Sequence, residues 1–193
     1  MSKKTELLNL LVPLDRGLKV STNALEQVLS IVSALEKENP NPTPTSDPQL
    51  LQGNWRMLFT TSRSLLVFGR LPLSSLGGVY QYIDTDRQQV YNVAEIRSLP
   101  LFDSIVSVVA DFTILSEKRI GVQFTRSIVG LQTLLGYQNV DRFIEQLQSG
   151  TRLVALDTPI TRRGNSWVDV TYIDDDLRIT RGNEGNIFIL QRV

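Results

Sequence analysis

The sequence predicts a mainly β fold: an antiparallel sandwich or barrel that follows an N-terminal helical extension. Three observations support this prediction. Apolar residues recur three and four positions apart in the first 38 residues, as they do along one face of a helix. From Gly53 onward they alternate with polar residues, which is typical of half-buried strands. The strand-like runs are short and separated by turn residues, without the regular strand–helix alternation of a parallel sheet.

Residues 3–38 are expected to form two helices, which Gly17 separates. Four prolines between Asn39 and Pro48 end the second helix, because Pro lacks an amide donor and restricts the residue before it. The predicted division of the chain has three parts: N-terminal helices packed on the barrel (1–38), a Pro-rich strap (39–49) and the barrel itself (50–193).

The strands are expected to follow one another with tight turns between them. They are predicted at residues 55–61, 78–84, 88–97, 106–114, 120–124, 152–157, 166–173, 176–181 and 186–192. Two stretches break the alternation. Residues 63–77 are rich in Leu, and residues 127–149 end in a short helix that we expect at 140–147.

Composition excludes several kinds of chemistry. The 193 residues include no His and no Cys, and 20 basic side chains balance 20 acidic ones. A Ser-His-Asp triad, the usual zinc sites and a disulfide are therefore ruled out. A net charge of zero also argues against a nucleic-acid partner. We predict a protein that is not an enzyme and that uses no cofactor and no metal.

The sequence also predicts where the protein resides. Polar residues and Pro13 interrupt the first apolar stretch, so it does not resemble the core of a signal peptide. No apolar run approaches the roughly 20 residues that span a bilayer. We expect a cytoplasmic protein with no signal or transit peptide, at most peripheral to a membrane.

Residues 48–83 contain three arginines and no acidic residue in an apolar context. An apolar, cationic loop suits an anionic lipid surface, since each basic group near such a surface gains about 1 kcal/mol. The candidates for membrane contact are Leu65, Leu66, Phe68 and Arg70. The alternative interpretation is that these leucines close one end of the barrel.

Three adjacent carboxylates, Asp174 to Asp176, precede Arg178 and Arg181. Calcium loops place their ligands at alternate positions, so we expect a turn here, with an Asp held by one of the two arginines. The alternative is an Asp of raised pKa that acts as a general base in an apolar barrel. Trp55 is expected to pack at a barrel end beneath an arginine from a distant strand, with Arg192 as the first candidate.

Two segments resemble those of a known family. Residues 50–62 are similar to the "L-G-x-W-x-L-x-Y-T-T-S" opening of the plastid lipid-associated proteins, also called plastid fibrillins or plastoglobulins. Residues 168–190 resemble their long C-terminal signature more closely. Phe59 stands where Tyr is commoner in the family.

The resemblance implies a lipocalin-like β-barrel that binds a small hydrophobic molecule: an isoprenoid, prenylquinone, carotenoid or lipid. It also implies contact with thylakoids or lipid bodies. The implied site residues are Trp55, Phe59, Tyr172, Asp174, Asp176, Arg178, Arg181 and Phe188. Because no transit peptide is visible, we expect a cyanobacterial homologue that works at the thylakoid surface.

Three hypotheses follow. The first is a non-catalytic binding protein for a hydrophobic ligand. The second is a structural protein that coats lipid bodies or membranes and has no cavity ligand. The third is an accessory enzyme of isoprenoid metabolism that uses an Asp.

Overall fold

Two helices, α1 (Lys3–Leu11) and α2 (Thr22–Lys37), lie before the sheet in a computed structural model that describes residues 2–67, 73–99, 101–161, 164 and 166–193. Each begins at a serine whose side chain accepts a hydrogen bond from a backbone N–H of the first turn. Gly17 lies in the connection at φ +107°, where a Cβ would stand 2.3 Å from the Thr60 carbonyl oxygen. Glycine thus lets the connection lie directly against the first strand.

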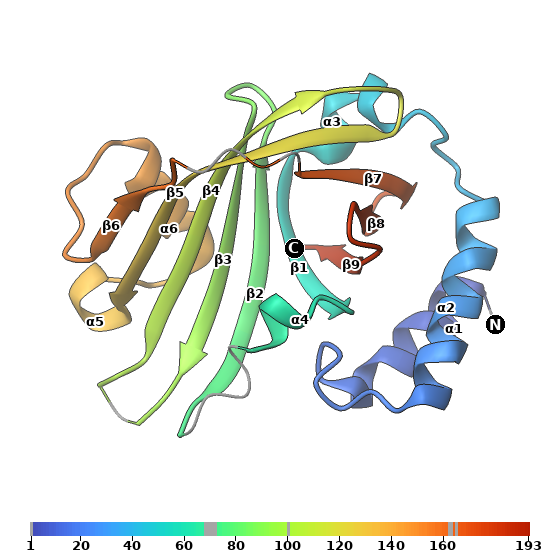
Figure 1. Ribbon diagram of the computed structural model, residues 1–193, viewed down its shortest axis with the longest axis horizontal. Coiled ribbons are helices and arrows are strands. Elements are labelled where there is room, and N and C mark those ends of the chain that lie inside the picture. Colours follow the sequence, from blue (N-terminus) through green and yellow to red (C-terminus); the bar gives the residue numbers. More distant parts are fainter. Residues whose placement is uncertain (1, 68–72, 100, 162–163, 165) are drawn as a thin grey trace.

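The strands form one antiparallel sheet that closes on itself. Within the described residues they are β1 (Gly53–Thr60), β2 (Ser75–Asp84), β3 (Gln89–Arg97), β4 (Ser104–Ile114), β5 (Arg119–Leu131), β6 (Leu156–Pro159), β7 (Ser166–Ile173), β8 (Leu177–Gly182) and β9 (Ile187–Arg192). Their order is β4-β3-β2-β1-β9-β8-β7-β5-β6, and β4 also pairs with β5. Every strand except β6 therefore belongs to a hydrogen-bonded ring, and β6 adds to β5 outside it (Figure 1).

The predicted mainly β, antiparallel fold with N-terminal helices is confirmed, and its strands make a single ring-closed sheet. Further α-helices in the described part of the chain are α3 (Pro48–Leu51), α4 (Arg63–Leu66), α5 (Gln132–Leu135) and α6 (Val140–Gln148), the last as predicted. Two boundaries were wrong. The strand expected at 152–157 forms at 156–159, and β5 continues to residue 131, because Ile128 packs beneath α6. The division into three parts stays a prediction.

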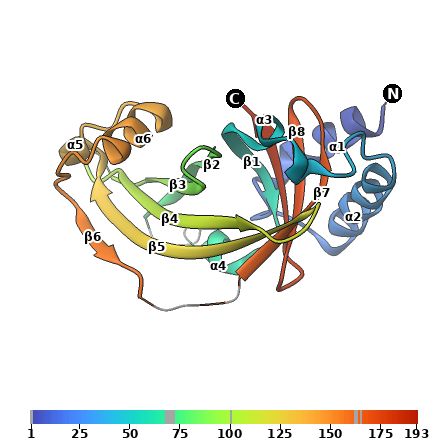
Figure 2. The same ribbon diagram turned by 90° about the horizontal axis from the view of Figure 1, so that it is seen from above.

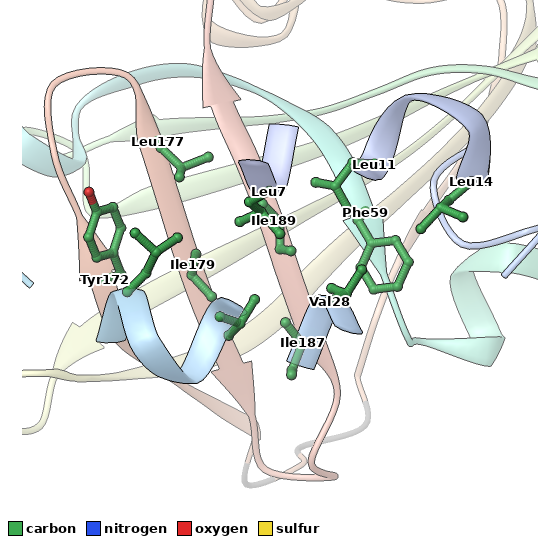
Figure 3. Packing of buried hydrophobic residues seen from close by; sticks show 12 residues of the cluster. Leu7, Leu11, Leu14, Val28, Phe59, Tyr172, Leu177, Ile179, Ile187 and Ile189 are labelled. Carbon is green, nitrogen blue, oxygen red and sulfur yellow. The ribbon is translucent and has the colours of Figure 1, made fainter. Parts of the chain in front are cut away.

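The N-terminal helices cover the outer face of β7, β8 and β9. Leu177, Ile179, Ile187 and Ile189 point outward from two adjacent strands and belong to one cluster with Leu7 of α1 and Val28 of α2 (Figure 3). Alternation along a strand then turns the intervening residues inward. One face of this part of the sheet packs against the helices, and the other faces the interior of the ring.

Two register shifts move side chains from one face to the other. One lies between Met57 and Phe59 on β1, and the other between Val170 and Tyr172 on β7. Phe59, one of the predicted ligand-site residues, therefore does not share a face with Trp55 and Met57. The extra residue of the bulge turns Phe59 into the cluster formed with α1 and α2 (Figure 3).

Helix α6 packs on the other side of the molecule, away from α1 and α2 (Figure 2). Its apolar face meets Tyr91, Val93 and Val109 of β3 and β4. These residues alternate with inward-facing ones, so α6 lies on the outer face of the sheet. No helix within the described ranges is long and apolar enough to cross a membrane.

Candidate ligand-binding cavity

A cavity of about 440 Å³ lies inside the ring of strands. This volume falls within the range of small-molecule pockets, roughly 300–1,000 Å³. Every strand of the ring contributes side chains to it, and most of them are apolar. Representative residues in strand order are Met57, Ile83, Val90, Val108, Val122, Val168, Thr180 and Phe188.

The residues that line the cavity include one buried cation, Arg178. This residue alternates with the outward-facing Leu177 and Ile179 on β8, so its side chain points inward and is only 1% exposed. Its Nη2 donates a hydrogen bond to Oε1 of Gln81, and Nε has no acceptor among the described residues. Gln81 in turn donates to Asn92 at 2.9 Å, which fixes the orientation of its amide.

Burial lowers the pKa of Arg178 to about 9, and the nearby positive charge of Arg192 acts in the same direction. None of the ion pairs of the described residues includes Arg178. Two other half-buried cations have carboxylate partners: Arg181 has Glu36, and Lys4 has Asp174. Among the described residues, the cavity therefore holds a desolvated positive charge that no carboxylate pairs with.

Trp55 is fully buried beside this charge. The guanidinium carbon of Arg178 lies 4.6 Å from its ring centroid, and that of Arg192 lies 4.2 Å away. Arg192 also donates hydrogen bonds to the carbonyls of Leu50, Gln52 and Asp175. The expected stacking of Arg192 on Trp55 is confirmed, and the arginine ties α3 to the last strand at this end of the ring.

Helix α4 and the β8–β9 turn also line the cavity. Ser62, Ser64 and Leu65 contribute from the α4 segment, and Asn183 and Glu184 from the turn. Leu66 is buried instead, with its Cδ1 3.5 Å from the position of a Cβ on Gly17. Two of the four predicted membrane-contact side chains thus pack within the molecule. The other two, Phe68 and Arg70, lie outside the described residues.

The structure brings together only part of the predicted ligand site. Arg178 and Phe188 line the cavity, and Trp55 stacks on Arg178. Phe59 and Tyr172 belong to the cluster under the N-terminal helices. The remaining predicted residues, Asp174, Asp176 and Arg181, form contacts with those helices.

The expected pairing of an Asp with Arg178 or Arg181 was wrong. Nζ of Lys4 in α1 donates to both Asp174 and Asp176, and Arg181 binds Glu36 of α2 through two hydrogen bonds of 2.7 and 2.9 Å. The partners lie 145 or more positions away along the chain, so local spacing could not indicate them.

Asp174 has a lowered pKa. Burial acts to raise it, but hydrogen bonds from the Tyr172 hydroxyl, the Lys4 ammonium and the backbone amides of Leu177 and Asp176 hold the pKa near 2. The enzyme hypothesis requires the opposite, an Asp of raised pKa inside the ring. Asp174 has neither property.

Sequence reasoning missed Gln81 and Asn92, which hold the Arg178 side chain in place. The available signal was the alternation of the strands. Asn92 lies two positions from Val90, and Gln81 lies two positions from Ile83, so each polar residue faces inward with an apolar one. A polar residue at an otherwise apolar inward position indicates a polar feature in the core. An arginine as the partner was not predictable from that pattern.

The sequence analysis also missed a set of exposed apolar side chains next to the β2 and β3 ends. Leu73 precedes β2 and is 80% exposed, and Phe102 in the β3–β4 connection is 60% exposed. Leu99 and Leu101 in the same connection are exposed as well. Ser75 pairs with Arg97, so these two segments are neighbours. We call these four residues the apolar rim.

A family model and several known proteins match nearly the whole chain. The model described as PAP_fibrillin matches residues 1–191. The chain is 33% identical to "Plastoglobulin-1, chloroplastic" of Pisum sativum and 32% identical to "Light-induced protein, chloroplastic" of Solanum tuberosum, over 98% and 97% of its length. It is 30% identical to "Chromoplast-specific carotenoid-associated protein, chromoplastic" of Cucumis sativus over 91% of its length. No solved structure matches the chain.

These three relatives are longer proteins, of which the chain spans 60%, 66% and 63%, less than two thirds in each case. Their names place them in chloroplasts or chromoplasts. The expectation of a cytoplasmic protein without a transit peptide gains no support from these relatives.

Proposed function

The chain belongs to the PAP_fibrillin family, as its two sequence motifs indicated, and on that premise we propose that it binds a small hydrophobic molecule inside the ring of strands without catalysis. The observation that carries this proposal is the cavity of about 440 Å³ lined mainly by apolar side chains from every strand of the ring. A closed sheet of eight strands is the architecture in which lipocalins hold one small ligand. The relative named as a carotenoid-associated protein supports a ligand of lipid type.

The cavity limits how much of a ligand it can enclose. A cavity of about 150 Å³ accommodates one benzene molecule. The cavity here has about three times that volume, so it encloses on the order of 18 non-hydrogen atoms. A carotenoid or a long prenylquinone would therefore enter with one end only, whereas a shorter lipid matches the cavity in volume.

The test is a binding assay with a cavity-filling variant. Purified protein is incubated with a carotenoid, a prenylquinone and a fatty acid, and the complexes are measured by native mass spectrometry and by extraction. Val108→Phe fills the cavity, and Val129→Phe makes the same change at an exposed position that does not line it. We expect binding to fall in the first variant and to persist in the second. Equal binding by both variants, or none by the wild type at micromolar concentration, would contradict the proposal.

The apolar rim favours a second role, peripheral contact with a thylakoid or lipid-body surface. Four exposed apolar side chains in two neighbouring connections are the kind of patch that marks an interaction surface, and Arg97 is exposed beside them. Liposome flotation should decrease in Leu73→Asp and Phe102→Asp. The control is Val12→Asp, which is 81% exposed near α1. Equal flotation of all three variants would exclude the rim as the contact.

A further inference from the structure

Arg178 supplies a second, independent constraint on the ligand. Its guanidinium has five N–H donors, and the acceptor that the described residues offer it is Gln81. Nε is buried without any acceptor. A buried donor without an acceptor is rare in folded proteins, and it is usually explained by function or by a missing partner.

The surroundings of this guanidinium are arranged for an anion. Arg192 places a second positive charge over the same Trp55 ring, at the same end of the ring of strands. The acidic residue that lines the cavity is Glu184, which lies in the β8–β9 turn and is hydrogen-bonded to Asn186 at 3.2 Å. The electrostatic potential therefore becomes more positive from the turn towards Trp55. A ligand with one negative end is favoured with that end at Arg178.

A neutral ligand would leave this arrangement unexplained. A quinone carbonyl or an alcohol can accept one hydrogen bond from Arg178, but it leaves the buried positive charge uncompensated. A carboxylate compensates the charge and accepts two N–H donors of the planar guanidinium at once. Gln81, fixed by Asn92, holds the guanidinium in place before the ligand arrives.

We infer that the cavity binds an amphipathic carboxylic acid, a fatty-acid-type molecule of about 18 non-hydrogen atoms, with its carboxylate on Arg178 and its chain against the apolar wall. This inference rests on the proposed function and names the class of ligand. The wall along the chain is formed by residues such as Val108, Val122 and Phe188. Arg178 is then the residue that determines specificity for an acid over a neutral lipid.

The experiment compares matched probes on the wild-type protein. Palmitate has 18 non-hydrogen atoms and a carboxylate, and hexadecanol has the same chain with a neutral head. Dissociation constants are measured by competition against a fluorescent lipid probe, with a short-tailed prenylquinone as a third competitor. We expect palmitate to bind at least about tenfold more tightly than hexadecanol, since hydrogen bonds to charged groups have a net value of about 1.5–3 kcal/mol.

Substitutions then assign the preference to one residue. Arg178→Met should raise the dissociation constant of palmitate about 10- to 100-fold and change that of hexadecanol by no more than about threefold. Arg178→Lys keeps the charge without the planar fork and should be intermediate. Arg56→Met removes an exposed arginine of β1 that does not line the cavity and should change neither constant. Hexadecanol binding also shows that each variant has folded.

The outcomes are separable. Equal affinity for palmitate and hexadecanol in the wild type, or an undiminished preference in Arg178→Met, would overturn the inference while the cavity proposal stands. Tighter binding of the prenylquinone than of palmitate would also overturn it. If none of the three probes bound, the proposed function itself would be contradicted.

Discussion

Asp174 and Arg178 lie four positions apart, at either side of one turn, and have opposite electrostatic surroundings. Asp174 faces the N-terminal helices and is held by the Lys4 ammonium, the Tyr172 hydroxyl and two backbone amides. Arg178 faces the cavity, where burial lowers its pKa to about 9 and no carboxylate compensates its charge. The first residue contributes to stability, whereas the second, in our proposal, serves ligand binding.

The first prediction concerns Asp174 and pH. Its pKa is near 2 in the folded protein and ordinarily 3.8, so its contribution is fully present above about pH 4. That contribution is lost as the pH falls through 2. Asp174→Asn should lower the free energy of unfolding by about 2 kcal/mol at pH 7. It should also flatten the decline of stability between pH 4 and pH 2.

Urea unfolding across pH 2–7 measures both effects. Asp175→Asn, which changes the exposed neighbour, is the matched control and should behave as the wild type. Lys4→Met should reproduce part of the loss. If the free energy of unfolding of Asp174→Asn fell between pH 4 and pH 2 as steeply as that of the wild type, the hydrogen bonds at Asp174 would not stabilise the fold.

At the scale of elements, β1 and β7 each serve two surfaces because each contains a bulge. Before its bulge, β1 places Trp55 and Met57 inside the ring, and after it Phe59 packs against the helices. On β7, Val170 lies inside and Tyr172 lies under the helices. The helices therefore depend on the same strands that line the cavity, but they contact the opposite face.

The second prediction concerns the attachment of α1. Leu7 is fully buried in the cluster with β8 and β9, whereas Val12, just after the helix, is 81% exposed. Leu7→Ala should cost about 2–5 kcal/mol of unfolding free energy, because it leaves a cavity in the packed interface. Val12→Ala should remain within about 0.5 kcal/mol.

Chemical denaturation measures the free energy of unfolding of both variants. Ligand binding by Leu7→Ala at low temperature should match that of the wild type, since no residue of α1 or α2 lines the cavity. A cost below about 1 kcal/mol for Leu7→Ala would mean that α1 is only loosely attached.

The same elements show how far the sequence predicts this structure. Alternation located most strands, and the short helix expected at 140–147 is α6. A bulge leaves no mark in a pattern of period two, so the faces of Phe59 and Tyr172 were not predictable. The partners of Asp174 and Arg181 come from helices far away in the sequence, and only the folded chain brings them together. Arg178 was selected by resemblance, but its lack of a counterion is visible only in three dimensions.

At the scale of the whole molecule, the first strand pairs with the last. Arg56 of β1 lies opposite Gln191 of β9, and this pairing completes the ring. The ring thus depends on contacts between residues more than about 100 positions apart, whose closure has a high entropic cost.

The third prediction uses a disulfide across this pairing, which the absence of native cysteines makes simple to interpret. Arg56→Cys with Gln191→Cys joins residues that are direct antiparallel partners, a separation that suits a disulfide. It should stabilise the oxidised protein by about 4–5 kcal/mol, because it closes a long loop in the unfolded chain.

The control pair, Gln89→Cys with Asp111→Cys, joins partners on β3 and β4 and closes a much shorter loop. Its gain should be about 3 kcal/mol. Urea unfolding with and without reductant gives both values. Failure of the 56–191 pair to oxidise in the folded protein would contradict the pairing of β1 with β9.

The packing of the N-terminal helices on the last strands has a consequence during synthesis. The helices at residues 3–37 are translated before the strands, but the surface that they cover is made of β7, β8 and β9, which come last among the described strands. At about 5–20 residues per second, this delay is on the order of ten seconds. During that time Leu7 and Val28 can pack on each other's helices and on Phe59, but they lack the part of their cluster that β7, β8 and β9 supply. The apolar face of these helices is therefore completed only when the last strand has been made.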